Sequence, residues 1–402
     1  MTASSYDLIV IGSGPSGLMG AITAARNGLG VLVLERMPKV GLKLLASGGG
    51  RCNLCNTLPE EEFMAAFGRQ GRFMHPALRI MGSVELRAFF QALNVPTQEE
   101  AHKVFPISGS AESVLGALLK ECRKLKVEIR TNCEATALQK EGGVKTAEVA
   151  IPSKAVLLAS GGKSYAALGG SASGYGLARR AGHDIVDPTP ADVPLLIRER
   201  WVKELSGVAV PGANLRIGLK GFPKAGTTGD LLFTHQGISG PVVLNSSGAV
   251  AEKFQAMDAV PLIIDFAPGL DDWQKAGGNK GVANALRPWI PSALAKSLCR
   301  LNSIDPDAPA SRLDEKKAAL LTGQINRCRL TATGTEGFNK AMVTRGGIDL
   351  KGVDPNTLES KLQAGLYFAG EALNLDGPCG GFNLQWAFSS GHLAGLKISE
   401  TL

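Results

Sequence analysis

The sequence contains no uninterrupted apolar run of about 18 residues, the length that a membrane-spanning helix requires. Its N-terminus, MTASSYD, also lacks the charged start, apolar centre and small-residue cleavage site of a secretory signal, because the first apolar run has the pattern of a buried strand. These absences predict a cytoplasmic protein without a membrane segment.

The sequence also lacks a cysteine-rich pattern: its seven cysteines are an odd number at ordinary frequency, which argues against a disulfide framework and fits a reducing compartment. Cys52 and Cys55 form a CxxC pair, but there is no second CxxC or Cys/His pair at ligand spacing, so we expect no metal site. A redox dithiol stays open, although such a pair usually stands at a helix start and these cysteines follow a glycine loop.

The sequence has no run of five or six basic residues. Its 43 lysines and arginines against 36 acidic residues give a formal net charge of +7, and the basic residues are scattered. A nucleic-acid partner is therefore permitted but not indicated. The length of 402 residues and the 44% hydrophobic content predict two to three domains with a sizeable core, and the 50 glycines suggest many tight turns.

One stretch, residues 6–35, has the organisation of a dinucleotide-binding unit. It contains an apolar run, the glycine turn Gly12-x-Gly14-x-x-Gly17, an alanine-rich helix, a second apolar run and then Glu35. Gly12 permits the tight turn, Gly14 lets the backbone approach a pyrophosphate, and Gly17 lets the helix pack on the strand. The amides at the helix start hold phosphates, and Glu35 accepts the hydroxyls of an adenosine ribose, which disfavours a 2′-phosphate. The position of the unit at the start of the chain favours FAD over NAD.

Three later segments fit the same cofactor. The loop SGGGRCN (47–53) offers backbone amides for an anion or carbonyl, or is a flexible connector. The run 154–162 is an apolar strand that ends in two glycines, and 365–371 is a turn, a strand and a Gly-Glu pair. Glycines then open a helix predicted from Trp386 to Ile398, whose N-terminus can stabilise negative charge on a flavin.

The segments GLKLLASGGGRCN (41–53), GDLLFTHQGISGP (229–241) and 365–391 resemble the YhiN-like (BaiN-type) flavoproteins, a family of NAD(P)/FAD-dependent oxidoreductases. The resemblance extends from end to end, with departures at Leu42, Cys55 and Cys379. It implies an α/β fold: a Rossmann-like, glutathione-reductase-like FAD-binding domain with an inserted β-rich domain and a small helical subdomain. We expect the FAD-binding domain at 1–187 and 346–402, and the insertion at 188–345 with its helical part at about 270–325.

The predicted site residues combine the glycine turn, the ribose acid and positions carried over from the family. The expected cofactor-binding residues are Gly12, Gly14, Ser16, Gly17, Glu35, Arg36, Lys43, Gly48, Asn53, Ala135, Gly161, Gly370, Glu371, Asp376, Gly381, Asn383 and Leu384.

Three residues are candidates for catalysis. His235 could donate a proton, although a histidine beside a turn is more often structural. Thr344 precedes paired glycines that form either part of the flavin's catalytic face or a hinge. Cys379 stands where the family more often has threonine, either near the flavin or as a small buried filler.

These observations predict an FAD-dependent oxidoreductase in which NADH or NADPH is a transient co-substrate, because no dedicated NAD(P) domain is visible. The expected acceptor is a small conjugated or carbonyl-containing molecule, which the family implies to be steroid-like. Two alternatives stay open: a flavoprotein that acts on RNA, and a flavin-bound sensor without turnover. The sequence does not determine the acceptor, the preferred nicotinamide or the oligomeric state.

Overall fold

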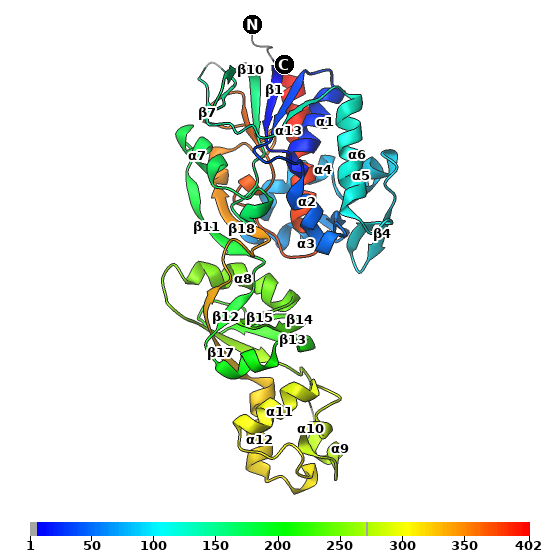
Figure 1. Cartoon of the computed structure of the whole chain (residues 1–402), viewed down its shortest axis with the longest axis vertical. Helices are drawn as coiled ribbons and strands as arrows, with labels where there is room; N and C mark the ends of the chain where they lie inside the picture. Colours follow the sequence, from blue (N-terminus) through cyan, green and yellow to red (C-terminus); the bar gives the residue numbers. More distant parts are fainter. Residues whose placement is uncertain (1–5, 141, 271) are drawn as a thin grey trace. The chain divides into compact units, whose positions relative to one another are not determined.

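The structure is a computed structural model that describes residues 6–140, 142–270 and 272–402. The chain divides into two compact units (Figure 1). The first unit comprises residues 1–188 and 343–402, and the second comprises residues 189–342. Each unit has its own hydrophobic core and is described separately below.

The first unit is built on a five-stranded parallel sheet. In spatial order its strands are β19 (Leu366–Phe368), β10 (Ser153–Leu158), β1 (Tyr6–Ile11), β2 (Val31–Leu34) and β6 (Glu128–Arg130). At the centre of this sheet, residues 8–11, 31–34 and 155–158 are Val, Ile or Leu apart from Ala155, and all of them are buried, as in parallel strands covered by helices. The chain makes its first crossover from β1 to β2 through helix α1 (Pro15–Arg26).

Helix α13 (Phe382–Thr401) packs against α1 in direct backbone contact (Figure 1). A Cβ atom added to Gly391 would lie 2.2 Å from the Ser16 carbonyl oxygen, and one added to Gly395 would lie 2.5 Å from the Gly20 carbonyl oxygen. Both contacts have the same sequence offset, so the two helices run parallel. The helix begins at Phe382, four residues before the predicted start at Trp386, because Gly381 at φ +93° serves as its N-cap residue.

The remaining elements of the first unit surround this sheet and helix pair. Its other helices are α2 (Leu42–Ala46), α3 (Glu60–Ala65), α4 (His75–Ile80), α5 (Ser83–Ala92), α6 (Ala111–Lys124) and α7 (Ser173–Arg180). Two small antiparallel sheets are formed by β3 (Cys55–Asn56), β5 (Lys103–Pro106) and β4 (Thr97–Glu100), and by β7 (Ala137–Leu138), β8 (Val144–Lys145) and β9 (Ala150–Ile151). Strands β11 (Ile185–Ala191) and β18 (Val343–Ile348) pair where the chain passes to the second unit and returns.

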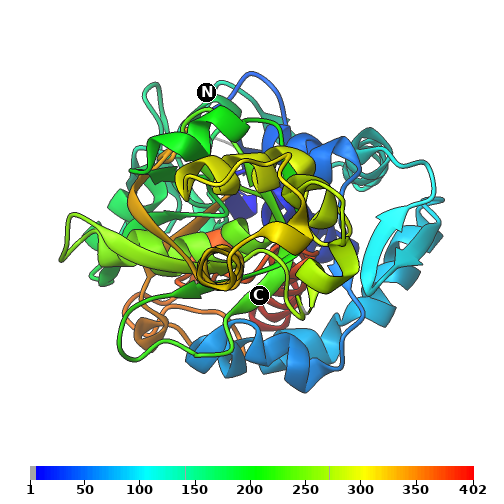
Figure 2. The ribbon, with the colours of Figure 1, turned by 90° about the horizontal axis from the view of Figure 1, so that it is seen from below.

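The second unit contains a closed β-barrel and a group of helices. Around the barrel the strands are β12 (Leu195–Ile197), β15 (Gly237–Ser239), β14 (Thr227–Phe233), β13 (Ala209–Ile217), β16 (Val260–Asp265) and β17 (Cys328–Thr335). The helices α9 (Trp273–Gly277), α10 (Val282–Ala285), α11 (Ser292–Leu301) and α12 (Glu315–Asn326) form one group, drawn mostly in yellow in Figure 2. Helix α8 (Pro241–Lys253), which our sequence analysis did not predict, packs on the barrel.

Among the described residues, no helix combines the length and the apolar character that crossing a bilayer requires.

Candidate functional site

The candidate site lies at the carboxyl edge of the parallel sheet. Gly12 follows β1, Glu35 follows β2, Gly161 comes shortly after β10 and Gly370 shortly after β19. Because the strands are parallel, these four segments meet at the same edge. Strand β1 lies between β2 and β10, which is the arrangement of a topological switch point, where open α/β sheets bind ligands.

The three glycines of the first turn are required for different reasons. A Cβ atom at Gly12 would lie 2.5 Å from the Ala159 carbonyl oxygen, and one at Gly17 would lie 2.0 Å from the Gly12 carbonyl oxygen. A Cβ atom at Gly14 would meet no protein atom within 4 Å among the described residues. Protein packing therefore requires Gly12 and Gly17, whereas the space beside Gly14 is open to a ligand.

The first turn of α1 is suited to hold an anion. Gly14 is the N-cap residue of this helix and has no side chain with which to cap it. Ser16 is buried in the first turn, and a Cβ atom at Gly370 would lie 2.6 Å from its hydroxyl oxygen. The segment after β19 thus borders the start of α1, where helix amides and the helix dipole favour a phosphate.

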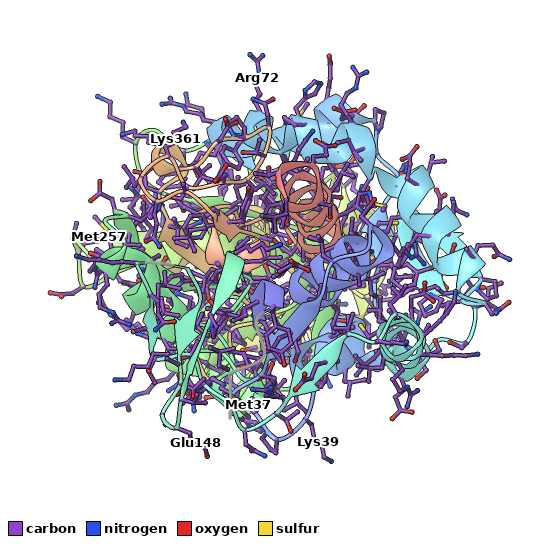
Figure 3. The ribbon with its side chains drawn as sticks, turned by 90° about the horizontal axis from the view of Figure 1, so that it is seen from above. Met37, Lys39, Arg72, Glu148, Met257 and Lys361 are labelled. Carbon is purple, nitrogen blue, oxygen red and sulfur yellow. The ribbon has the colours of Figure 1, made fainter. Side chains whose placement is uncertain are left out.

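Glu35 is held in place by the backbone around it. Its Oε2 accepts hydrogen bonds from the Ser13 amide (3.1 Å) and the Ser13 hydroxyl (2.5 Å), and its Oε1 accepts one from the Met37 amide (2.8 Å). Figure 3 labels Met37 and Lys39 in the loop that follows. The carboxylate therefore has a defined orientation at the end of β2, the position from which such an acid binds a ribose.

Three buried polar atoms near this edge have no hydrogen-bond partner among the described residues: Arg36 Nε, Ser160 Oγ and Tyr175 Oη. Arg36 uses its Nη2 to donate to the Gly170 carbonyl oxygen at 3.1 Å. Burial raises the pKa of Tyr175, and the nearby charge of Glu371 adds to this effect. Unpaired buried polar atoms are rare and costly, so the open space at Gly14 and these orphaned atoms together fit a polar ligand such as a dinucleotide.

A polar cluster joins four segments that are distant in sequence. The Lys43 ammonium lies 2.7 Å from Glu371 Oε2, and these side chains are 26% and 20% exposed. Glu371 Oε1 accepts hydrogen bonds from the Thr344 amide (2.8 Å) and the Ser164 hydroxyl (3.2 Å). Both Ser164 and Thr344 are buried, and their hydroxyl oxygens lie 2.8 Å apart.

Gly162 makes this cluster possible, because a Cβ atom there would lie 2.5 Å from Thr344 Oγ1 and 2.6 Å from Glu371 Oε1. Of the two acids predicted after β19, Glu371 therefore belongs to the Lys43 cluster. Asp376 instead forms a two-pronged ion pair with Arg345, with N–O distances of 2.9 to 3.2 Å.

The other predicted cofactor residues also belong to the first unit. Gly48 adopts φ +57° in the short turn 47–50, and Ala135 is buried between β6 and β7. Leu384 is half-buried on the first turn of α13. The side-chain amides of Asn53 and Asn383 both bond to the backbone of the segment before α13.

The three predicted catalytic residues differ in their surroundings. Thr344 is buried on β18 in the cluster just described. His235 is exposed in the turn between β14 and β15 of the second unit. Cys379 is exposed in the loop before α13, so the interpretation of this residue as a buried filler is wrong.

Cys52 and Cys55 are both fully buried. Burial raises the pKa of each thiol to about 12. A redox dithiol needs an accessible thiolate at neutral pH, so these surroundings favour two inert structural thiols.

Our sequence analysis missed four polar residues around the site: Ser13, Asn56, Ser164 and Tyr175. Two of them had an available signal, since Ser13 lies inside the turn Gly12-x-Gly14 and Ser164 lies between two glycine pairs, 161–162 and 169–170. Asn56 and Tyr175 carry no local pattern that marks a site.

Comparison with known proteins places the chain among flavoenzyme-like sequences. Residues 6–397 match the family described as HI0933-like protein Rossmann domain. The 3-dehydro-bile acid delta(4,6)-reductase of Clostridium scindens is 34% identical, over 97% of this chain and 98% of that protein. The ribosomal RNA dihydrouridine synthase of Escherichia coli is 30% identical, over 96% of each chain.

Solved structures show the same fold at low sequence identity. The 3-ketosteroid-delta4-(5alpha)-dehydrogenase of Rhodococcus jostii has a TM-score of 0.53 at 17% identity, over 98% of this chain and 97% of that one. The 3-ketosteroid delta1-dehydrogenase of Sterolibacterium denitrificans has a TM-score of 0.56 at 14% identity, over 99% and 100%. These matches confirm the predicted α/β fold class, a Rossmann-like FAD-binding domain with additional β-rich structure.

Proposed function

The chain belongs to the HI0933-like family of Rossmann-domain proteins, and on that premise we propose that it is an FAD-dependent reductase. Its electron donor is NADH or NADPH, and its acceptor contains a carbon–carbon double bond conjugated to a carbonyl group. The observation that carries the proposal is the open space beside Gly14 at the uncapped start of α1. A ligand that approaches the backbone closely accounts for this space, which no described protein atom fills.

Different residues of the first unit hold different parts of the cofactor. The first turn of α1 binds the pyrophosphate with its backbone amides, and Glu35 binds the adenosine ribose. The cluster of Lys43, Ser164, Thr344 and Glu371 holds the segments after β10 and β19 beside that turn. When bound, the flavin supplies hydride transfer from the nicotinamide to the acceptor.

The nicotinamide donor visits the site transiently. Among the residues that the structure describes, one glycine turn of the dinucleotide type adjoins the parallel sheet of the first unit, and the second unit forms an antiparallel barrel with helices rather than a second such sheet. A donor that leaves after each turnover needs no dedicated domain, so this architecture supports alternate binding of donor and acceptor.

The acceptor class follows from the chemistry of two relatives. One is named for the reduction of a 3-dehydro bile acid and the other for the formation of dihydrouridine in ribosomal RNA. Both reactions add hydrogen across a carbon–carbon double bond that is conjugated to a carbonyl. A reduced flavin can donate a hydride to a double bond of this type, so the shared bond type describes the acceptor proposed for this chain.

RNA is the second candidate substrate. Two relatives named ribosomal RNA dihydrouridine synthase are each 30% identical to the chain over nearly its whole length, and the net charge of +7 suits a polyanion. Side chains of both signs project from the outline of Figure 3, among them Lys39, Arg72, Glu148 and Lys361. The mixed charges and the 34% identity to the bile acid reductase favour the small molecule.

The first test is the visible spectrum of the purified protein before and after anaerobic addition of NADH or NADPH. Flavin absorption that bleaches rapidly with one nucleotide supports a reductase and identifies its donor. Bleached protein is then mixed with a conjugated 3-oxosteroid or with ribosomal RNA that lacks dihydrouridine, and reoxidation and product are measured. A protein that cannot be loaded with FAD contradicts the proposal, and one that binds FAD but is not reduced supports a sensor.

A further inference from the structure

The loop 377–381, which leads into α13, is held by side-chain amides from both ends of the chain. Asn383, in the first turn of α13, reaches back to the start of this loop. Its Oδ1 accepts from the Gly377 amide at 2.8 Å, and its Nδ2 donates to the Gly377 carbonyl oxygen at 2.8 Å. The amide thus closes a ring between the loop and the helix and uses both of its polar atoms.

Two further asparagines hold the other end of the loop. Asn56 Nδ2 donates to the Gly380 carbonyl oxygen at 2.9 Å. In the amide orientation that satisfies its neighbours, Asn53 Oδ1 accepts from the Gly381 amide at 3.0 Å. A Cβ atom at Gly381 would lie 2.4 Å from the Cys55 carbonyl oxygen, so the loop also rests directly on this segment.

The register of α1 and α13 shows where the first turn of α13 lies relative to the start of α1. Gly391 packs on Ser16, in the first turn of α1, and the two helices run parallel. Helix α13 begins at Phe382, nine residues before Gly391, which is roughly 13 Å at a rise of about 1.5 Å per residue. The N-terminus of α13 therefore projects beyond the start of α1 in the same direction, as Figure 1 shows.

The two helix starts suit the two ends of one bound molecule. The start of α1 is the proposed pyrophosphate site, and a ribityl chain separates a pyrophosphate from a flavin ring. With FAD bound in this way, the amides of the first turn of α13 would stabilise the negative charge that the flavin ring gains on reduction. This step rests on the proposed binding of FAD.

We propose that Asn53, Asn56 and Asn383 are positioning residues that act through the first turn of α13 and so set the reduction potential of the bound flavin. Their role is indirect, because their amides bond to the protein backbone. A neutral amide suits this role, since it supplies both a donor and an acceptor without adding a charge that would oppose the helix dipole.

The test compares Asn383→Ala and Asn56→Ala with wild type in two measurements. Hydrogen exchange of the apoprotein measures how firmly the loop is held, and we expect exchange at residues 377–383 to become faster in both variants. The midpoint potential of the FAD-loaded protein reports the flavin. We expect a tenfold weaker preference for the reduced form in each variant, which lowers the potential by about 30 mV. In the double variant, the potential should fall by less than the sum of the two single shifts, because both residues hold the same loop.

The control is Asn27→Ala, which removes an amide that bonds to the Thr23 carbonyl oxygen at the opposite end of α1. It should change neither the potential nor the exchange at 377–383. Faster exchange with an unchanged potential would overturn the proposal, since the loop would then be only structural. Failure of FAD binding appears already in wild type and refutes the proposed function instead. If Asn383→Ala does not fold, Asn56→Ala, which loses one loop contact, decides the matter.

Discussion

Replacing Gly14 with valine should weaken FAD binding while leaving folding nearly unchanged, which distinguishes it from substitutions at Gly12 and Gly17 in the same glycine turn. Gly14 has φ −72° and ψ −178°, an extended conformation that valine adopts readily before a proline. A Cβ atom there meets no described protein atom within 4 Å. We therefore expect the apoprotein to fold.

Two opposing effects determine how far the Gly14→Val substitution changes the free energy of unfolding of the apoprotein. Removing a glycine restricts the unfolded chain and stabilises by about 0.4–1 kcal/mol. Replacing glycine at an N-cap position with valine costs a similar amount, because valine caps poorly. The free energy of unfolding should then change by about 1 kcal/mol or less, whereas the side chain fills the space reserved for the pyrophosphate. We expect FAD affinity to fall at least 100-fold, which corresponds to about 2.7 kcal/mol.

The matched control is Gly17→Ala, whose Cβ atom would lie 2.0 Å from the Gly12 carbonyl oxygen. Overpacking against backbone typically costs about 1–3 kcal/mol, and a contact this short should reach the upper end. Urea denaturation of each apoprotein and FAD titration by flavin fluorescence measure the two quantities. A folded Gly14→Val protein that binds FAD as tightly as wild type would refute the assignment of this turn.

Three further predictions concern the Lys43–Glu371 ion pair, the buried thiols of Cys52 and Cys55, and the buried imidazole of His183. Lys43→Met should lower the free energy of unfolding of the apoprotein by about 1 kcal/mol in urea denaturation at low salt, because the partly buried Glu371 loses its partner at 2.7 Å. Cys52 and Cys55 should resist alkylation at pH 8, followed by mass spectrometry, because burial holds the pKa of each thiol at about 12. Burial lowers the pKa of His183, so the unfolded chain binds a proton more readily than the folded chain does. The free energy of unfolding should therefore fall as the pH drops below about 6.5, the ordinary pKa of histidine. His183→Asn should make this pH dependence weaker in urea denaturation between pH 7 and pH 5.

Each of these outcomes has a control within the chain. Lys43→Arg keeps a cation beside the carboxylate and should preserve most of the stability. The exposed thiol of Cys379 should be alkylated quickly under conditions in which the buried pair is not. Ser360→Ala removes the partner of His183 Nε2 at 2.7 Å while leaving the imidazole, so the pH slope should remain. Fast alkylation of the buried pair, or an unchanged slope in His183→Asn, contradicts the corresponding reasoning.

The sequence by itself determined the cofactor unit, because its signals are local. A buried strand, a glycine turn, a helix and an acid within residues 6–35 interact with one another over short separations, so their spacing carries the geometry. The α/β class followed from that unit together with the family resemblance of the glycine-rich segments at both ends of the chain. The matching family and the parallel sheet agree with this prediction.

Only the tertiary structure decided how distant polar residues combine. Lys43 and Glu371 are separated by 328 positions, and no periodicity or motif links a lysine to one acid rather than another. The same holds for Asn53 and Asn383, whose predicted place beside the cofactor gave no indication that their amides bind the backbone of one loop. Such contacts arise because the packing of α13 on α1 and the order of the parallel strands bring both ends of the chain to one edge, and that packing depends on the whole core.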